Sequence, residues 1–259
     1  MTQHTSKRSA ARGASRSRRA PAAAPEQPGR QTGVHVGPRY GILGGTFDPP
    51  HLGHLALAQE VYARLSLDRV WFLPAREPPH KTGRTISSAA DRLAMLERAI
   101  ASDERFAVST VELERPGPSY TVDTLDELRA LWGADTWMAL ILGWDMLAYL
   151  PQWRDAPGVI ARSDQIVVTR RPGVVASEGE VARLEEQLPG LRQKLTVAPA
   201  PQLAISGTEV RTRVAQMLPV RYLTPDAVAT YIEMRALYRV VDQVARGERG
   251  GELAGGVGG

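Results

Sequence analysis

The sequence predicts an α/β protein with a doubly wound parallel sheet and helices at its C-terminal end. Short apolar runs alternate with segments of helical period between residues 39 and 240, as strand–helix–strand crossovers require. The most apolar run, at residues 136–143, is expected to be a central strand, because central strands of parallel sheets are buried on both faces. In such a sheet, ligands bind beyond the carboxyl ends of the strands, where the strand order reverses.

Each apolar run gives an expected strand, and the segments between the runs give the helices. Strands are predicted at residues 39–45, 69–75, 105–114, 136–143, 165–172 and 194–199, and helices at 52–65, 88–102, 120–133, 178–188, 205–217 and 224–238. Ser88 and Asp91 mark one helix start, and Gly133 marks a helix end. Thr224 is expected as the N-cap of the last helix, with Pro225 as its first residue.

Residues 1–38 form a basic segment and residues 241–259 a Gly-rich one, and both are expected to be disordered tails of a domain at 39–240. The basic segment holds seven basic residues and one acidic residue, a charge of +6, so the rest of the +4 chain carries −2. The folded body is therefore not basic, and nucleic acid is not expected as its partner. A solvated extension or an upstream start codon is the favoured interpretation of the segment, and a transit peptide or a nucleic-acid-binding arm is the alternative.

The chain has no cysteine and no apolar run of the roughly 20 residues needed to cross a bilayer. The lack of cysteine excludes disulfides, thiolate zinc sites and a cysteine nucleophile. The N-terminus also lacks the continuous apolar stretch of a secretory signal. These features predict a cytoplasmic protein without a membrane segment.

The loop after the first expected strand reads GGTFDPPHLGH, residues 44–54. Its glycines permit close approach of the backbone to a ligand, and Pro49 and Pro50 favour a turn into a helix. His51 and His54 are spaced i, i+3 and project from one face of the first helical turn. With the helix dipole and free N–H groups, they predict a phosphate site. A cap plus a surface histidine, or a two-histidine metal site, is the alternative, but a zinc helix more often carries HExxH, which this sequence lacks.

The pattern GxFDPxHxGH resembles the nucleotide-binding signature of the HIGH-type nucleotidylyltransferases, which have a Rossmann-like fold. The resemblance implies that His51 and His54 are catalytic, because they contact the phosphates of ATP and stabilise charge during transfer. It also implies that adenine lies near the two glycines at the strand end. The ATP-binding residues implied in this loop are Gly44, Gly45, Thr46, Phe47 and Gly53.

A second motif, ISGTEVR, occupies residues 205–211. Ser206 opens an S-x-x-E capping box at a helix start, and Arg211 one turn later presents a planar fork for phosphate oxygens. The motif resembles ISxTxIR, the second signature of the same family. This implies that Ser206 and Thr208 bind ATP and that Arg211 is catalytic. Gly207 departs from the family pattern, in which a second serine is common, so one hydroxyl contact is lost.

Three segments between these motifs bear on the second substrate: PPHK at 78–81, SYTVDTL at 119–125 and GWDMLAYLPQW at 143–153. Lys81 is expected in a loop at the binding edge, and Thr121 where a helix begins. The Trp153 ring can stack on a flat ligand, and Asp145 can bond a ribose hydroxyl. A solvated lysine, a simple helix cap and a core tryptophan are the alternative interpretations.

In their order along the chain, these segments resemble those of the bacterial nicotinate mononucleotide adenylyltransferases, over residues 40–238. The resemblance implies that Lys81, Thr121 and Trp153 line a mononucleotide pocket. It implies that Gly143 and Asp145 lie near the adenosine ribose, as further ATP-binding residues.

The implied reaction transfers AMP from ATP to nicotinate mononucleotide and yields nicotinate adenine dinucleotide and pyrophosphate, a step of NAD biosynthesis. The attacking phosphate is already ionised, so the reaction needs positioning and charge stabilisation rather than a general base. Mg²⁺ is expected as the cofactor, held by phosphates and water with no assigned protein ligand.

The competing interpretations are a related enzyme acting on nicotinamide mononucleotide or phosphopantetheine, a catalytically silent homologue, and a nucleic-acid-associated protein acting through its basic segment. The sequence leaves open the oligomeric state and the choice between nicotinate and nicotinamide.

Overall fold

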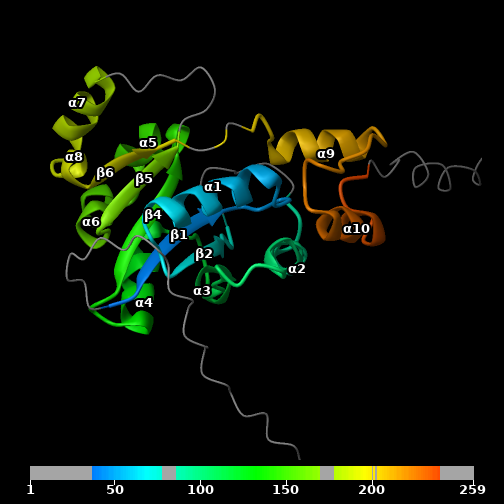
Figure 1. The fold of residues 1–259 in the computed structure, drawn as a ribbon, viewed down its shortest axis with the longest axis horizontal. Helices are drawn as coiled ribbons and strands as arrows, with labels where there is room; N and C mark the ends of the chain where they lie inside the picture. The colour runs from blue at the N-terminus through cyan, green and yellow to red at the C-terminus, as the bar shows by residue number, and fades with distance from the viewer. Residues whose placement is uncertain (1–36, 78–85, 170–177, 200, 202, 240–259) are drawn as a thin grey trace, which may run out of the picture. The chain divides into compact units, whose positions relative to one another are not determined.

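The computed structural model of this 259-residue chain describes residues 37–77, 86–169, 178–199, 201 and 203–239. The described residues contain a six-stranded sheet in the order β3-β2-β1-β4-β5-β6 (Figure 1), and every neighbouring pair of strands is parallel. The strands are β1 (Arg39–Gly45), β2 (Arg69–Pro74), β3 (Phe106–Val108), β4 (Trp137–Gly143), β5 (Gln165–Thr169) and β6 (Leu195–Ala198). The strand order reverses between β1 and β4 at the centre of the sheet. This confirms the doubly wound sheet and the central position of the 136–143 run.

Helices cover both faces of the sheet. One core joins the sheet to α1 (Leu52–Arg64) and α2 (Ala89–Ile100), and Figure 1 shows α1 crossing that face. The other core joins it to α4 (Thr121–Trp132), α5 (Trp144–Tyr149), η1 (Leu150–Gln152) and α6 (Ala156–Arg162). In β1, Ile42 belongs to the second core and Leu43 to the first, because successive side chains along a strand point to opposite faces.

The remaining elements are α3 (Val111–Glu114), α7 (Glu178–Gln187), α8 (Leu191–Lys194), α9 (Gly207–Ala215) and α10 (Asp226–Met234). A small third core packs Met95 of α2 against Val228 and Ile232 of α10. Because α2 itself contacts β2 and β3, this core ties the C-terminal helix to the sheet.

Local helix signals are confirmed where a side chain caps the backbone. Ser88 is the N-cap of α2 and accepts a hydrogen bond from Asp91 N at 3.0 Å. Ser206 is the N-cap of α9 and accepts a hydrogen bond from Glu209 N at 3.1 Å. Gly133 ends α4 with a backbone φ of 98°, which residues other than glycine rarely adopt.

The predicted strand at 105–114 is wrong in its second half. β3 ends at Val108, and Val111 begins the short helix α3. β3 is the edge strand of the described sheet, and it pairs there with β2 alone, over its three residues. Beyond β3, the buried carboxylate of Glu112 accepts the Thr124 hydroxyl of α4 at 2.9 Å, and this tertiary contact overrides the strand propensity.

The expected N-cap of the last helix is also wrong. Pro225 is the N-cap of α10, and the helix begins at Asp226. Thr224 is buried, and its hydroxyl donates to the Pro50 carbonyl at 2.7 Å. A tertiary hydrogen bond therefore replaces the local cap that the sequence pattern predicts.

Several expectations fall on residues that the structure does not describe. They are the basic segment up to residue 36, the Gly-rich segment from 240, the loop with Lys81, and residues 170–172 of the predicted strand, which in β5 ends at Thr169. The domain limits at 39 and 240 stay predictions. Within the described ranges, no helix is long and apolar enough to cross a membrane.

Candidate active site

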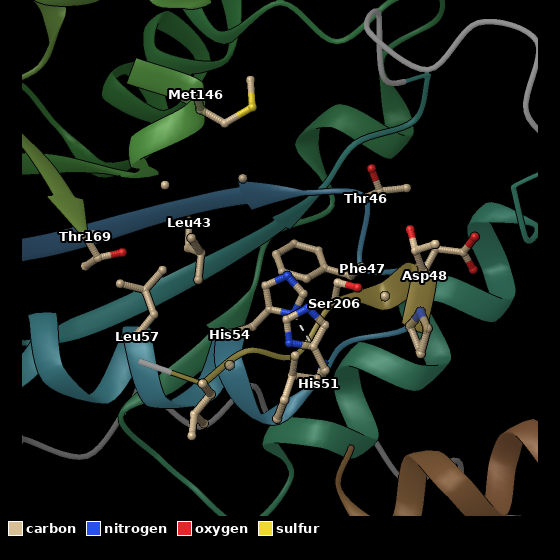
Figure 2. Close-up of a pocket in the computed structure, with 18 of the residues that line it drawn as sticks. Leu43, Thr46, Phe47, Asp48, His51, His54, Leu57, Met146, Thr169 and Ser206 are labelled. Carbon is tan, nitrogen blue, oxygen red and sulfur yellow. Dashed lines mark hydrogen bonds between the residues drawn. The ribbon is translucent and has the colours of Figure 1, made fainter. Parts of the chain in front are cut away.

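Two histidines lie where the loop after β1 enters α1. His51 is the N-cap of α1, and His54 lies in its first turn. The His51 backbone N–H donates to His54 Nδ1 at 3.2 Å, and the two rings stack with 3.7 Å between their centroids (Figure 2). Because Nδ1 of His54 is an acceptor, a neutral His54 carries its proton on Nε2. The backbone thus fixes which nitrogen of His54 donates to a ligand.

His51 is kept neutral by its surroundings. The residue is 9% exposed, and burial lowers the pKa of His51 from 6.5 to about 4. Its Nδ1 has no hydrogen-bond partner among the described residues. A buried nitrogen in this situation gains from a polar ligand atom, because an unsatisfied buried polar group is costly. His51 therefore offers a neutral nitrogen rather than a fixed positive charge.

The second motif faces the histidines across a cavity. Helix α9 begins at Gly207, after the N-cap Ser206, and Arg211 follows one turn later. Arg211 Nη1 donates to the Asp48 carbonyl at 2.5 Å, and Nη2 donates to Thr208 Oγ1 at 3.2 Å. The N-terminal ends of α1 and α9 both line one cavity of about 410 Å³. Two helix N-termini and a guanidinium favour an anionic ligand there.

Most of the residues predicted for catalysis and ATP binding line this first cavity. They are His51, His54, Arg211, Gly44, Thr46, Phe47, Gly53, Gly143, Ser206 and Thr208. Gly45 lines a second cavity instead, and Asp145 lines neither of the two. Thr169 and Met146 also line the first cavity (Figure 2), and sequence reasoning missed both.

Two glycines at strand ends line the first cavity without filling it. An added Cβ at Gly44 or Gly143 meets no heavy atom within 4 Å, so both strand ends border open space. Gly207 differs, because a Cβ there lies 3.1 Å from the Asp48 carbonyl oxygen. The departure from the family's serine at this position therefore accompanies a close approach of α9 to the loop after β1, and a side chain there requires a shift of the neighbouring backbone.

A second cavity of about 570 Å³ adjoins the first. Thr121, at the start of α4, and Trp153 line it, whereas Lys81 lies outside the described residues. Gly44 and His54 line both cavities. The two cavities therefore meet at the carboxyl end of β1, with His54 at their junction.

Trp153 belongs both to the core and to the second cavity. It is partly buried and packs against the core that contains α4, so the alternative interpretation as a core residue is partly correct. Its indole Nε1 is buried and has no hydrogen-bond partner among the described residues. An indole N–H usually finds an acceptor when buried, which makes this one available to a bound ligand.

Sequence reasoning missed Glu112, because residues 105–114 read as a strand. Glu112 is 8% exposed and lines the second cavity. Burial raises the pKa of Glu112, while hydrogen bonds from Thr124 and Ser119 act in the opposite direction. Its carboxyl group thus joins α3 to the start of α4. No local pattern marks this role, because it depends on the packing of two helices.

Comparisons with known proteins point the same way as the site geometry. The model of the cytidylyltransferase-like family matches residues 42–213, which include both histidines and Arg211. A probable nicotinate-nucleotide adenylyltransferase of Roseiflexus sp. (strain RS-1) is 48% identical over 77% of this chain and 97% of its own length. One of Dehalococcoides mccartyi (strain ATCC BAA-2266 / KCTC 15142 / 195) is 44% identical over 76% of this chain and 96% of its own.

A solved structure is similar at much lower identity. The Plasmodium falciparum nicotinic acid mononucleotide adenylyltransferase complexed with NaAD has a TM-score of 0.63 and 17% identity, over 78% of this chain and 97% of that one. At this identity, the likeness supports the fold alone.

Proposed function

The chain belongs to the cytidylyltransferase-like family and, within it, to the nicotinate-nucleotide adenylyltransferases, and we propose that it transfers the adenylyl group of ATP to nicotinic acid mononucleotide. The products are nicotinate adenine dinucleotide and pyrophosphate. Relatives named as probable nicotinate-nucleotide adenylyltransferases are 42–48% identical to this chain over 86–98% of their own length. Their name supports nicotinic acid mononucleotide, rather than phosphopantetheine, as the acceptor.

One observation carries the proposal: two cavities open at the carboxyl edge of the sheet and share His54. ATP suits the first, where two helix N-termini and Arg211 favour phosphates. A mononucleotide suits the second, where Trp153 presents an aromatic ring and Thr121 begins a helix. In this arrangement the α-phosphorus of ATP lies at the junction, next to the acceptor phosphate.

The acceptor phosphate is the nucleophile of the reaction. One of its oxygens attacks the α-phosphorus of ATP, a new P–O bond forms, and the bond to the β-phosphate oxygen breaks to release pyrophosphate. The nucleophile is ionised at neutral pH, so no side chain has to remove a proton. Catalysis of this type consists of alignment and of stabilising the charge that develops.

The roles of the site residues follow from their positions and stay proposals. His54 donates from Nε2 to an oxygen of the α-phosphate, and neutral His51 adds a second nitrogen beside it. Arg211 and the N-terminus of α9 hold the phosphates of the leaving group. Because Arg211 already contacts the loop after β1, it couples the two phosphate-binding ends.

We propose that Mg²⁺ enters with ATP. Among the residues that the structure describes, no group of three or more His, Cys, Asp or Glu side chains is suited to holding a metal ion. Phosphate oxygens and water are the proposed ligands, because Mg²⁺ keeps several of its waters and usually binds together with substrate phosphates. The bound ion offsets phosphate charge, and none of the roles above depends on a protein ligand to it.

The proposal is tested by pyrophosphate release from the purified protein with ATP and Mg²⁺. Nicotinic acid mononucleotide, nicotinamide mononucleotide and phosphopantetheine are compared as acceptors. We expect kcat/KM for the first to exceed the others at least about tenfold, which corresponds to about 1.4 kcal/mol of discrimination. Turnover with phosphopantetheine alone contradicts the proposed acceptor and keeps the phosphate site.

Deletion of residues 1–38 separates this proposal from a nucleic-acid-binding role. An adenylyltransferase keeps its kcat/KM without the basic segment, whereas a protein that acts through this segment loses its affinity for nucleic acid and its salt dependence. Action in the cytoplasm stays a prediction from the sequence.

A further inference from the structure

The loop that carries the histidines is held from outside by the last part of the described chain. The Thr224 hydroxyl donates to the Pro50 carbonyl at 2.7 Å, across 174 residues of sequence. The Tyr238 hydroxyl donates to Asp48 Oδ1 at 2.6 Å, across 190 residues. Tyr238 lies just after α10 and lines neither of the two cavities. Its hydroxyl contacts the loop through Asp48, and Tyr238 also interacts electrostatically with Arg211.

The Asp48 side chain is well suited to receive this contact. It is 7% exposed, and its second oxygen accepts the Ser87 N–H at 3.3 Å. The guanidinium of Arg92, 1% exposed, interacts electrostatically with Asp48 and donates to the Thr46 carbonyl at 2.9 Å. Burial and the nearby carboxylate raise the pKa of Tyr238 above its ordinary value, so its hydroxyl keeps its proton at neutral pH and can donate to Asp48.

The backbone beside Asp48 explains why the loop needs outside contacts. Phe47 has a φ of 50°, in the left-handed region that favours glycine. A non-glycine residue keeps such a conformation where its surroundings determine it. The Phe47 side chain is 2% exposed, and its ring meets the His54 ring edge-on at 5.0 Å. A change in the backbone at Phe47 therefore moves the Phe47 ring, against which the His54 ring packs.

We propose that Tyr238 is a positioning residue for adenylyl transfer: through Asp48 it holds Phe47 in its left-handed conformation and thereby holds the His54 ring at the junction of the two cavities. Its effect on the rate rests on the proposed function, whereas its effect on the loop does not.

Tyr231 provides a matched control for Tyr238. Its hydroxyl donates to Asp91 Oδ1 at 2.9 Å, so it also joins the C-terminal segment to an aspartate of the preceding chain. Asp91 lies on α2, and neither partner lines a cavity. Tyr238→Phe and Tyr231→Phe each remove one hydroxyl and keep the ring, so neither creates a large cavity.

The test measures amide hydrogen exchange in residues 46–54 of the full chain, together with kcat and KM. Tyr238→Phe is expected to speed exchange in this loop and to lower kcat about tenfold, with less than about threefold change in either KM. Tyr231→Phe is expected to leave all of these values within about twofold. Equal effects of the two variants, or unchanged exchange or unchanged kcat in Tyr238→Phe, overturn the proposal.

A double-mutant cycle adds a second readout. In an Asp48→Ala background, Tyr238→Phe is expected to lower kcat by less than about twofold, because its partner is already gone. Losses that multiply independently overturn the proposal, since they mean that Tyr238 acts by another route. If the wild-type protein turns over no pyridine mononucleotide, the proposed function fails, and loop exchange alone decides whether Tyr238 holds the loop.

Discussion

His51 and His54 are hydrogen-bonded to each other in both directions. The His51 N–H donates to Nδ1 of His54 at 3.2 Å, and the His54 N–H donates to the His51 carbonyl at 2.9 Å. With their rings stacked, the two residues form one unit that the start of α1 orients toward the first cavity. Substituting either histidine therefore removes its own imidazole nitrogens and also the stacked ring that supports the other histidine.

Replacing His54 with alanine is expected to lower kcat about 10²-fold or more, the scale of one lost transition-state donor. The loss falls mainly on kcat, because the proposed hydrogen bond strengthens as charge develops on the α-phosphate. Steady-state pyrophosphate release measures it, and a thermal unfolding curve shows that the variant is folded. A folded variant with an undiminished rate contradicts the proposed role.

The buried His51 makes stability depend on pH in a defined window. Its pKa is about 4 in the folded protein and 6.5 in the unfolded reference. Between these values the unfolded chain binds the extra proton, so the contribution of His51 to the free energy of unfolding is fully present above pH 6.5 and is lost as the pH drops toward 4. The contribution of this one group is at most about 3 kcal/mol.

A His51→Asn variant isolates this contribution, because asparagine is a good N-cap without a titrating ring. Urea unfolding between pH 4 and pH 7.5 is expected to show a flatter dependence in the variant than in the wild type. Identical slopes for the two proteins across this window mean that His51 titrates normally in the folded state.

The two open glycines are expected to affect the two substrates differently. Gly143 lines the first cavity, whereas Gly44 lines both. A Cβ added at either position meets no heavy atom within 4 Å, so a side chain there starts in open space rather than among packed atoms. Gly143→Val is therefore expected to raise KM for ATP about tenfold, about 1.4 kcal/mol, with KM for the mononucleotide nearly unchanged. Gly44→Val is expected to raise both, and the same selectivity in the two variants contradicts the assignment of one substrate to each cavity.

Trp153 tests the pocket of the acceptor. Loss of the ring in Trp153→Ala is expected to raise KM for the mononucleotide about tenfold, since aromatic stacking contributes about 1 kcal/mol beyond simple burial. Trp153→Phe, which keeps an aromatic face, is expected to raise it less than about threefold, and KM for ATP stays within about twofold in both. Because the residue also packs on the core, the comparison is made below the unfolding temperature of both variants. Equal KM values for alanine and phenylalanine exclude stacking.

The strands and the two end motifs could be predicted because their signals are local. Continuous apolar runs mark β1 and β4, and Ser206 caps α9 as its S-x-x-E pattern predicts. The spacing of His51 and His54 places both at one helix start before any packing is known. These features depend on neighbours within a few residues, which a single sequence contains.

The missed features depend on residues that are distant in sequence. Thr224 has every property of a helix cap, but its hydroxyl bonds the loop 174 residues earlier. Glu112 looks like part of a strand until Thr124 and the packing of α4 are known. Tyr238 follows a helix with no local sign of its contact to Asp48. A pattern along the chain cannot report which distant groups will meet, so these roles required the fold.

The residues that contact the loop after β1 from a distance are synthesised after all the described strands. A chain leaving the ribosome has exposed every described strand once Ala198 has emerged, yet Thr224 and Tyr238 follow later. At about 5–20 residues per second, the strands of the sheet are present seconds before the two residues that contact the loop after β1. A nascent or truncated chain that ends before Thr224 therefore contains every described strand but neither of these two contacts to the loop after β1, so we expect this loop to be less ordered in such a chain than in the full chain.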